Sequence, residues 1–248
     1  MPPETRSFAD ASRGPRLFDP AMIAAVRRSE GNAETTAIEP IAEPEVTGPQ
    51  YWERARVPRP PVTRSRTGIQ MSPYRFAPDE QVGPPEMLKS LRMAAPGLIR
   101  TAHEILDIEG PMPVPRLITL LVRRFGIPRL DPQRRYHVTR IVAPQFRIID
   151  DFAWPTGSKP TTWRVARRVG DPRDRRLVDI CPEELQNAME FVLGSVEALT
   201  RDDLLTETTT LLGYPRIPVP AKPWVEAALD RAVAASRFLE ADGFLGLR

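Results

Sequence analysis

The chain of 248 residues contains few of the side chains on which most catalytic and metal sites depend. It has one cysteine, Cys181, and two histidines, His103 and His137. A single cysteine excludes a disulfide within the chain and fits a reducing compartment such as the cytoplasm. Neither histidine has a cysteine or a second histidine at the spacing of a zinc site. We therefore expect no bound metal and no cofactor.

Long apolar runs are also missing. No stretch approaches the roughly 18 consecutive apolar residues that a membrane span needs. The first residues, MPPETRSFADASRG, lack the apolar centre of a signal peptide. Hydrophobic residues still make up 41% of the chain, enough for part of it to bury a core. These observations predict a cytoplasmic protein that does not bind membranes.

Three features that resemble reactive sites have simpler interpretations. Cys181 precedes a proline and has no nearby base, so we expect a buried, inert thiol. The Asp150–Asp151 pair lies in a predicted hairpin turn, where aspartate commonly forms the turn. The segment TGSKPTT resembles a phosphate loop, but it lacks the earlier glycine and has proline where Ser or Thr would bind magnesium. The sequence therefore predicts a protein without catalytic activity.

Proline is abundant, with 29 residues, more than twice the usual frequency. Over residues 1–72 apolar residues show no sustained period, and Pro, Glu, Thr and Arg dominate, which predicts a disordered proline-rich arm. Within this arm, Asp19 and Pro20 can cap a short helix that would either fray or dock on a partner. The stretch 57–68 is typical of an extended basic linker.

Residues 73–178 show a helical period followed by a β pattern. Apolar residues predict helices over 96–108, over 115–125 and around 136–142, each bounded by proline, glycine or a turn. Residues 146–154, FRIIDDFAW, are rich in β formers around an aspartate pair and predict a hairpin. Three helices followed by a hairpin are typical of a winged helix.

The same order returns in residues 179–248. Helices are predicted from Pro182, from the N-cap Thr200 and over 225–233, and Asp242-Gly243 predicts a hairpin turn within 238–247. Two pairs of segments align between the halves. FGIPRL at 125–130 matches LGYPRI at 212–217, and residues 146–152 match residues 238–244. Such a repeat indicates two copies of one unit, the alternative being chance similarity between short helices. We expect a mainly α fold with small β-hairpins, built as tandem winged-helix-like repeats after a disordered N-terminal arm.

The two repeats differ in charge. Residues 111–176 contain 15 basic and 5 acidic residues, whereas residues 177–248 contain 6 basic and 12 acidic residues. All basic residues except Lys89, Lys159 and Lys222 are arginine, whose forked guanidinium suits phosphate groups. We therefore expect the basic first repeat to contact nucleic acid, and the acidic second repeat to contact the first repeat or another protein.

Contact residues can be proposed from the usual docking of a winged helix. Its third helix enters the major groove, and its hairpin touches the backbone or minor groove. Basic residues in and beside these elements of the first repeat are therefore candidates, with phosphate contact favoured over base readout. They are Arg129, Arg134, Arg135, His137, Arg140, Arg147, Lys159, Arg164, Arg167 and Arg168. The alternative is an ordinary solvated basic face.

The tryptophans near the hairpins allow two interpretations. Trp154 and Trp163 bracket a turn and could stack on a base. Packing of these rings against the core behind the hairpin is the favoured interpretation. Trp224 in the second repeat is also expected in the core.

From about Pro73 onward the chain resembles a specific family. The residues that carry the resemblance are PYRFA at 73–77, IEGPMPVPRL at 108–117, RRFGIPR at 123–129, FAWP at 152–155, TTWR at 161–164, DICPEELQNAM at 179–189 and LLTETTTLLGYPR at 204–216. In order and spacing they are similar to the C-terminal domain of unknown function of large bacterial superfamily I helicase-like proteins. Those proteins often bear a Vsr-like or restriction-endonuclease-like nuclease domain, and some belong to anti-phage defence loci.

The resemblance implies a domain appended to a nucleic-acid motor, without a catalytic residue that could be carried over. This chain departs from the family because the helicase and nuclease domains are replaced by the arm, so no ATPase or nuclease activity is implied. We expect a non-catalytic nucleic-acid-binding module, with DNA as ligand and a helicase or nuclease as partner. A protein-interaction adaptor is one alternative. A transcription regulator is another and would need a dimer with suitably spaced recognition helices.

Overall fold

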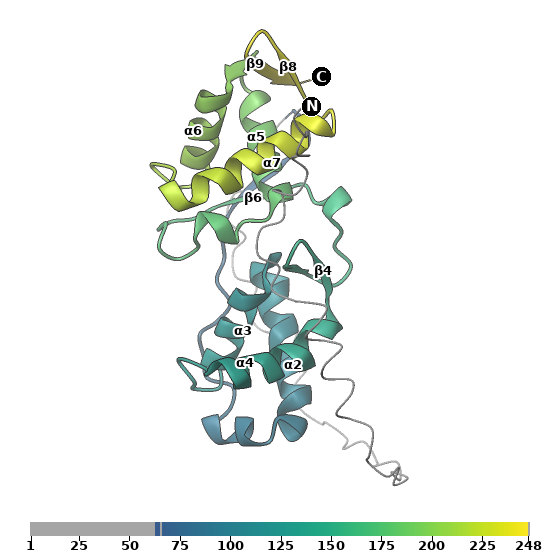
Figure 1. The fold of residues 1–248 in the computed structure, drawn as a ribbon, viewed down its shortest axis with the longest axis vertical. Coiled ribbons are helices and arrows are strands. Elements are labelled where there is room, and N and C mark those ends of the chain that lie inside the picture. Colours follow the sequence, from purple (N-terminus) through teal and green to yellow (C-terminus); the bar gives the residue numbers. More distant parts are fainter. Residues whose placement is uncertain (1–62, 65, 248) are drawn as a thin grey trace, which may run out of the picture. The chain divides into compact units, whose positions relative to one another are not determined.

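The computed structural model describes residues 63–64 and 66–247, which belong to one compact unit over residues 56–248. The predicted disorder of residues 1–62 and the short helix predicted after Asp19 lie outside the described residues. About half of the described chain is helical, and the strands are short and form three small sheets (Figure 1). The expected mainly α class with small β-hairpins is confirmed at this level.

The first half contains three α-helices and a three-stranded antiparallel sheet. Its elements are α2 (Leu91–Glu109), β3 (Met112–Pro113), α3 (Val114–Arg123), α4 (Pro132–Val142), the short 3-10 turn Ala143–Gln145, β4 (Arg147–Ile149) and β5 (Phe152–Trp154). The sheet has the order β3-β5-β4. Asp150 and Asp151 join β4 to β5 with φ of 49° and 66°, a backbone conformation that aspartate tolerates in turns. The predicted hairpin and its aspartate turn are confirmed.

The second half repeats this order of elements. It comprises α5 (Pro182–Leu193), β7 (Leu199–Thr200), α6 (Arg201–Leu211), α7 (Lys222–Ala234), β8 (Phe238–Ala241) and β9 (Phe244–Leu247). Its sheet has the order β7-β9-β8, so the strand that follows the first helix pairs with the last strand in both halves. The Asp242-Gly243 turn between β8 and β9 is at positive φ, as a tight hairpin requires.

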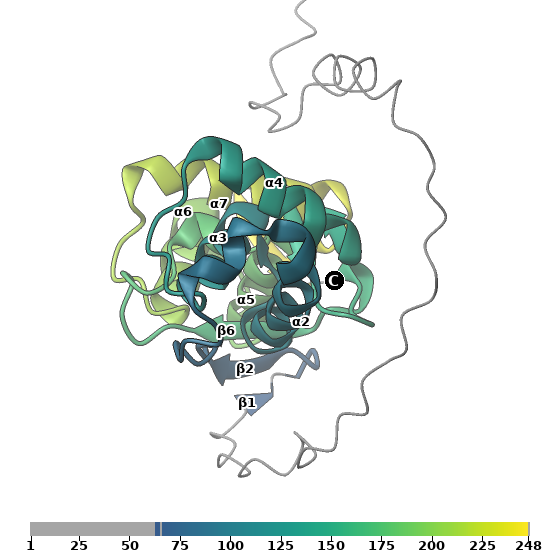
Figure 2. The same cartoon turned by 90° about the horizontal axis from the view of Figure 1, so that it is seen from below.

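A third sheet joins segments that are far apart in the sequence. Strand β2 (Gln70–Pro73) pairs antiparallel with β1 (Thr63–Arg64) and parallel with β6 (Val165–Arg168) (Figure 2). Ile69 and Met71 are buried beside this sheet. The predicted end of the arm at residue 72 is therefore wrong, because the strand is formed with a partner almost a hundred residues away. Local composition does not reveal such a pairing.

The predicted start of the first helix is also corrected. The helix begins at Leu91, and Pro96 lies inside it rather than at its first turn. A proline within a helix removes one backbone N–H, which leaves a carbonyl one turn earlier without its partner. Here Pro96 and Arg92 are both exposed. Solvent can therefore hydrate that carbonyl, and the helix continues.

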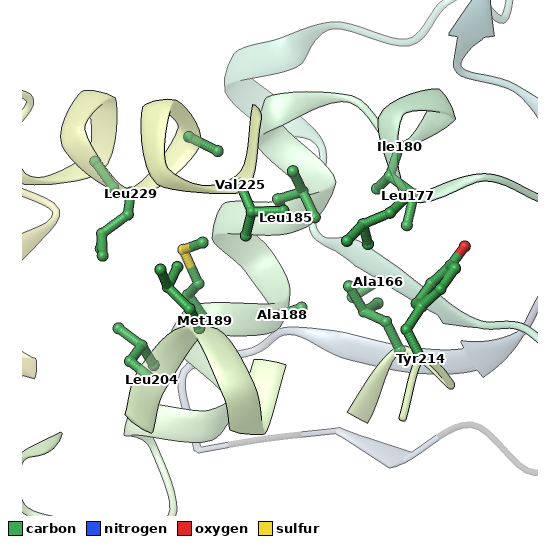
Figure 3. Close-up of a cluster of buried hydrophobic side chains, with 14 of the residues drawn as sticks. Ala166, Leu177, Ile180, Leu185, Ala188, Met189, Leu204, Tyr214, Val225 and Leu229 are labelled. Atoms are coloured by element: carbon green, nitrogen blue, oxygen red, sulfur yellow. The ribbon is translucent and has the colours of Figure 1, made fainter. Parts of the chain in front are cut away.

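Two main apolar cores hold the unit together. The first lies among α2, α3 and α4 and includes Leu98, Leu117 and Val138. The second lies among α5, α6 and α7, with Leu185 and Met189 of α5 at its centre (Figure 3). The remaining elements are the 3-10 turns Pro85–Lys89, Pro160–Thr162, Leu177–Asp179 and Val219–Ala221.

The second core extends beyond the predicted second repeat. Ile69, Ala166, Val169 and Leu177 pack into it, although all four precede residue 179. The predicted boundary between residues 178 and 179 therefore does not separate the cores. Strand β6 and the basic loop after it belong structurally with the acidic half. Among the described residues, no helix has both the length and the apolar character needed to cross a membrane.

Candidate nucleic-acid interface

Helix α4 exposes several cationic side chains, while its two valines are buried. Asp131 caps the helix, its Oδ1 accepting a hydrogen bond from the Arg134 backbone N–H at 2.8 Å. Val138 and Val142 are fully buried in the first core. The helical period places Arg140 away from these valines. Arg134, in the first turn of the helix, and His137 are also exposed. From Pro132 to Val142 the helix contains no acidic residue, so nothing on the helix itself neutralises these side chains.

An aromatic ring lies among these cations. The Arg140 guanidinium is 6.0 Å from the centroid of the Tyr136 ring, and that ring makes an edge contact with His137 at 5.6 Å. Tyr136 is 37% exposed, although its apolar character predicted a position toward the core. An exposed ring beside arginine can stack on a base or a sugar. We therefore define the α4 face as Arg134, Tyr136, His137 and Arg140.

The arginines at the start of α4 have different surroundings. Arg129 and Arg135 line one open hollow. Arg135 is half-buried, and its Nη1 donates a hydrogen bond to Thr119 Oγ1 on α3 at 3.2 Å. The Arg134 Nε lies 4.0 Å from Asp131 Oδ2, and both side chains are well exposed, so this pair contributes little to stability. Arg134 remains available to a ligand, whereas Arg135 is partly held by α3.

A separate small cavity adjoins the first hairpin. We call it the hairpin notch, and it has a volume of about 210 Å³. Its lining residues are Gln145, Phe146, Arg147, Trp154, Pro155, Thr156, Gly157, Ser158 and Lys159. Arg147 begins β4 and is paired in register with Trp154 of β5, so the strand pairing places Arg147 on the notch. Lys159 follows the turn after β5. The structure thus brings the predicted residues Arg147 and Lys159 to one cavity.

The turn in the notch is held by local hydrogen bonds. The Ser158 backbone N–H donates to the Pro155 carbonyl at 3.0 Å, and Gly157 has φ of 79°, which favours glycine. The Thr156 hydroxyl lies 3.4 Å from His103 Nδ1 on α2. The His103 ring in turn contacts Phe146, with 4.5 Å between ring centroids. Helix α2 therefore supports both sides of the notch.

Three of the predicted contact residues belong to another part of the molecule. Arg164, Arg167 and Arg168 lie just before or within β6, which packs on the second core. The Arg164 Nη1 lies 3.3 Å from Glu190 Oε2 of α5, while Arg168 is exposed. Arg167 is only 6% exposed, so its prediction as a nucleic-acid contact is wrong. Its charge is instead matched inside the protein.

Arg167 belongs to a buried ionic cluster around Glu184. Two guanidiniums bind this carboxylate, with Nη2 of Arg167 at 2.6 Å and Nη2 of Arg175 at 2.8 Å from Oε2. Burial on its own would raise the pKa of Glu184, but the two guanidiniums outweigh it and lower the pKa to about 2. The carboxylate is therefore ionised at neutral pH. Arg167 Nη1 also donates to the carbonyls of Glu109 and Gly110, at 2.8 and 2.7 Å, at the end of α2.

The cluster therefore links the two halves. It connects the C-terminal end of α2, where a cation is favoured, with the first turn of α5, where an anion is favoured. Sequence reasoning placed these arginines on a surface because it had no means of pairing residue 167 with residue 184. A long-range pairing of this kind leaves no periodic signal in the sequence.

The first hairpin is also covered by the second half. Phe152 of β5 is stacked on Trp224 of α7, with 5.8 Å between ring centroids and 14° between planes. At the hairpin turn, Asp150 Oδ2 accepts a hydrogen bond from Arg231 Nη1 at 2.6 Å. The Trp224 Nε1 donates to the Ile180 carbonyl at 3.0 Å. The contacts of Phe152 with Trp224 and of Asp150 with Arg231 seat α7 against the first hairpin.

The tryptophans and the cysteine occupy interior positions. Trp154 is 1% exposed and makes an edge contact with the half-buried Trp163 at 5.8 Å. The favoured packing interpretation of these rings is therefore confirmed, and Trp224 is likewise largely packed. Cys181 is fully buried, and burial raises the pKa of its thiol well above the usual value. The prediction of a buried, inert thiol agrees with this environment.

Among the residues that the structure describes, none covers the second hairpin as α7 covers the first. By the 92-residue offset, Phe244 corresponds to Phe152 and Asp242 corresponds to Asp150. Phe244 is 52% exposed and Leu239 on β8 is 49% exposed. Within the described residues, Asp242 forms no ion pair. The exposed cations of α7 are paired, Lys222 with Glu226 and Arg231 with Asp150, so this helix has no row of unpaired cations like the α4 face.

Within the described part of the chain, no group of three or more His, Cys, Asp and Glu side chains is placed to bind a metal ion. The chain matches no protein-family model, no curated protein and no solved structure.

Proposed function

We propose that the chain is a non-catalytic nucleic-acid-binding accessory module whose halves are both winged helices. The element order supports this, because each half runs helix, strand, helix, helix, strand, strand, with the first strand paired to the last. In that arrangement the third helix is the one that enters a groove of DNA. In the first half this helix is α4.

The α4 face is the observation that carries the proposal. Arg134, His137 and Arg140 are exposed on one helix that has no acidic residue, beside the exposed ring of Tyr136. Such a row attracts phosphates and releases counterions when it binds them. Arginine without an arranged set of polar partners favours backbone contact over base readout. Double-stranded DNA is the proposed ligand.

The biological setting is proposed from the family resemblance. The C-terminal domains of bacterial superfamily I helicase-like proteins are attached to a motor that moves on nucleic acid. A domain of the same kind would act with a helicase or nuclease in the cytoplasm, in DNA metabolism or in defence. The acidic half would then face protein, because its charge repels a duplex.

The test is a fluorescence-anisotropy titration of the full chain with a short random-sequence duplex and with a single strand, at two salt concentrations. Arg134→Glu/Arg140→Glu should lower the affinity at least tenfold, because two phosphate contacts become repulsions. The matched control is Arg216→Glu/Lys222→Glu, which changes charge equally at exposed sites in the second half. The absence of binding at low salt, or an equal loss in the control, would contradict the proposal.

A second candidate function is a protein-interaction adaptor, and the uncovered second hairpin favours it. Phe244 and Asp242 of this hairpin correspond to Phe152 and Asp150 of the first hairpin. Those two residues contact Trp224 and Arg231 of α7. A partner helix that carries an aromatic ring and an arginine would reproduce those contacts. Co-purification from source cells should then yield a partner protein. The Phe244→Glu variant should no longer bind this partner, whereas the Arg134→Glu/Arg140→Glu variant should still bind it. A protein retained by both variants would not support this function.

A further inference from the structure

The hairpin notch contains two cations and no acidic side chain. Arg147 and Lys159 are both exposed, and neither forms an ion pair with a described residue. By contrast, Arg164 near β6 is paired with Glu190, and Arg231 of α7 is paired with Asp150. Two unpaired cations at one small cavity repel each other, and an anion placed between them would relieve that repulsion.

The notch also provides neutral hydrogen-bond donors. Ser158 and Gln145 line it, and the serine hydroxyl and the glutamine amide can each donate to a phosphate oxygen. Hydrogen bonds to a charged acceptor are stronger than those between neutral groups. The turn that holds Thr156 and Ser158 is closed by its own hydrogen bond and supported by α2, so the donors are positioned before a ligand arrives.

Apolar groups form the remaining wall. Phe146, Trp154 and Pro155 line the notch beside the two cations. Trp154 is almost fully buried, and its indole N–H has no acceptor among the described residues. A ligand that combines an anionic group with a flat or sugar-like portion would match both the polar and the apolar parts of this lining.

The size of the notch limits the ligand. Its volume of about 210 Å³ is below the roughly 300–1,000 Å³ of pockets that enclose a whole drug-sized molecule. The notch therefore suits a phosphate with little more than the adjoining sugar. A phosphate monoester carries a charge of about −1.5 to −2 at pH 7, more than the single charge of an internal phosphodiester. Two cations without an acid match the monoester better.

The notch continues directly from the α4 face along the chain. Helix α4 ends at Val142, the 3-10 turn Ala143–Gln145 follows it, and Gln145 to Arg147 then line the notch. We propose that the hairpin notch binds the terminal phosphate of a nucleic-acid strand that lies on α4. This inference rests on the proposed function and deepens it, because it assigns the chain to strand ends rather than to continuous duplex.

The test compares three otherwise identical oligonucleotide duplexes, one with a 5′-phosphate, one with a 3′-phosphate and one with neither. A fluorophore within the duplex leaves both ends free for anisotropy titration with the full chain. One of the two phosphorylated duplexes should bind roughly tenfold more tightly than the unmodified one, a difference of about 1.4 kcal/mol. Whichever end responds identifies the source of the phosphate.

Variants place the effect at the notch. Arg147→Gln/Lys159→Gln should bring the ratio between phosphorylated and unmodified duplex close to one. The ratio is the readout, since a general loss of charge weakens all three duplexes together. Arg216→Gln removes an exposed cation outside the notch and should leave the ratio unchanged. Circular dichroism of each variant establishes that the chain remains folded.

The outcomes separate this inference from the proposed function. If all three duplexes bind equally and binding depends on Arg134 and Arg140, the terminal-phosphate inference is overturned and the proposed function stands. If no duplex binds, the proposed function fails, and the notch is tested with deoxynucleoside 5′- and 3′-monophosphates against the free nucleoside. Quenching of tryptophan fluorescence by a monophosphate, lost in Arg147→Gln/Lys159→Gln, would support a phosphate site. No difference from the nucleoside would overturn it.

Discussion

The guanidinium of Arg167 lies against the carboxylate of Glu184, with Nη2 2.6 Å from Oε2 and Nε 3.0 Å from Oε1. Both side chains are buried, and Arg175 binds the same carboxylate through both of its terminal nitrogens. A charge taken out of water needs such compensation, because an unpaired buried ion is strongly destabilising. The stability of the whole unit therefore depends on one glutamate.

Replacing this glutamate should be severe. Glu184→Gln leaves Arg167 and Arg175 buried without their anion, and we expect the free energy of unfolding to fall by about 3–5 kcal/mol. Urea denaturation followed by circular dichroism measures the change. The matched control is Glu183→Gln, a half-buried neighbour outside the cluster, which should cost under about 1 kcal/mol. Equal losses at the two positions would contradict the role assigned to the cluster.

The same cluster predicts acid sensitivity. Burial opposes ionisation of Glu184, but Arg167 and Arg175 lower its pKa from the usual 4.5 to about 2. Because this pKa is lower in the folded than in the unfolded chain, the stabilisation is complete above pH 4.5. It is lost as the pH falls from there to about 2, and amounts to on the order of 3 kcal/mol. Unfolding midpoints in urea across this range should show the loss, and a flat profile would count against it.

Two glycines at equivalent repeat positions should respond differently to alanine. Gly126 and Gly213 both have positive φ, which costs an alanine about 1–2 kcal/mol. At Gly126 the new Cβ would meet the flexible side chain of Gln81 at 3.0 Å, whereas at Gly213 it would lie 2.3 Å from the Val169 carbonyl oxygen. Gly126→Ala should therefore cost about 1–2 kcal/mol and Gly213→Ala clearly more. Thermal unfolding of the two variants side by side tests this order.

The thiol of Cys181 should be unreactive in the folded chain. It is fully buried, and burial raises its pKa, so little thiolate is present near neutral pH. A colorimetric thiol reagent at pH 8 should give no signal with the native protein within minutes, and one equivalent after unfolding in urea. Rapid reaction of the native chain would show that the core around Cys181 opens readily.

Local patterns were sufficient for the helices and hairpins. The aspartate pair at Asp150–Asp151 and the Asp242-Gly243 turn predicted both hairpins, because the residues that tolerate positive φ are few. Apolar spacing predicted α4, and Arg140 lies on the side of this helix away from Val138 and Val142. These features depend on neighbours a few residues away, which the sequence displays directly.

Charge was harder to interpret from the sequence. A run of arginines around residue 167 has the same composition whether it faces solvent or a buried glutamate. The structure divides that run, because Arg167 and Arg175 are enclosed by the packing of β6 on α5, whereas Arg168 stays exposed. Burial of a charge depends on the partner that compensates it, and that partner is set by tertiary packing.

The sequence by itself therefore determined the repeated order of helices and hairpins, the buried thiol and the presence of several cations on α4. Only the tertiary structure decided that β2 pairs with β6, that the basic segment before residue 179 packs on the acidic half, and that Arg147 and Lys159 share one notch. The physical reason is distance along the chain. Helical period and turn chemistry act between near neighbours, while strand pairing and ion pairing join residues that only folding brings together.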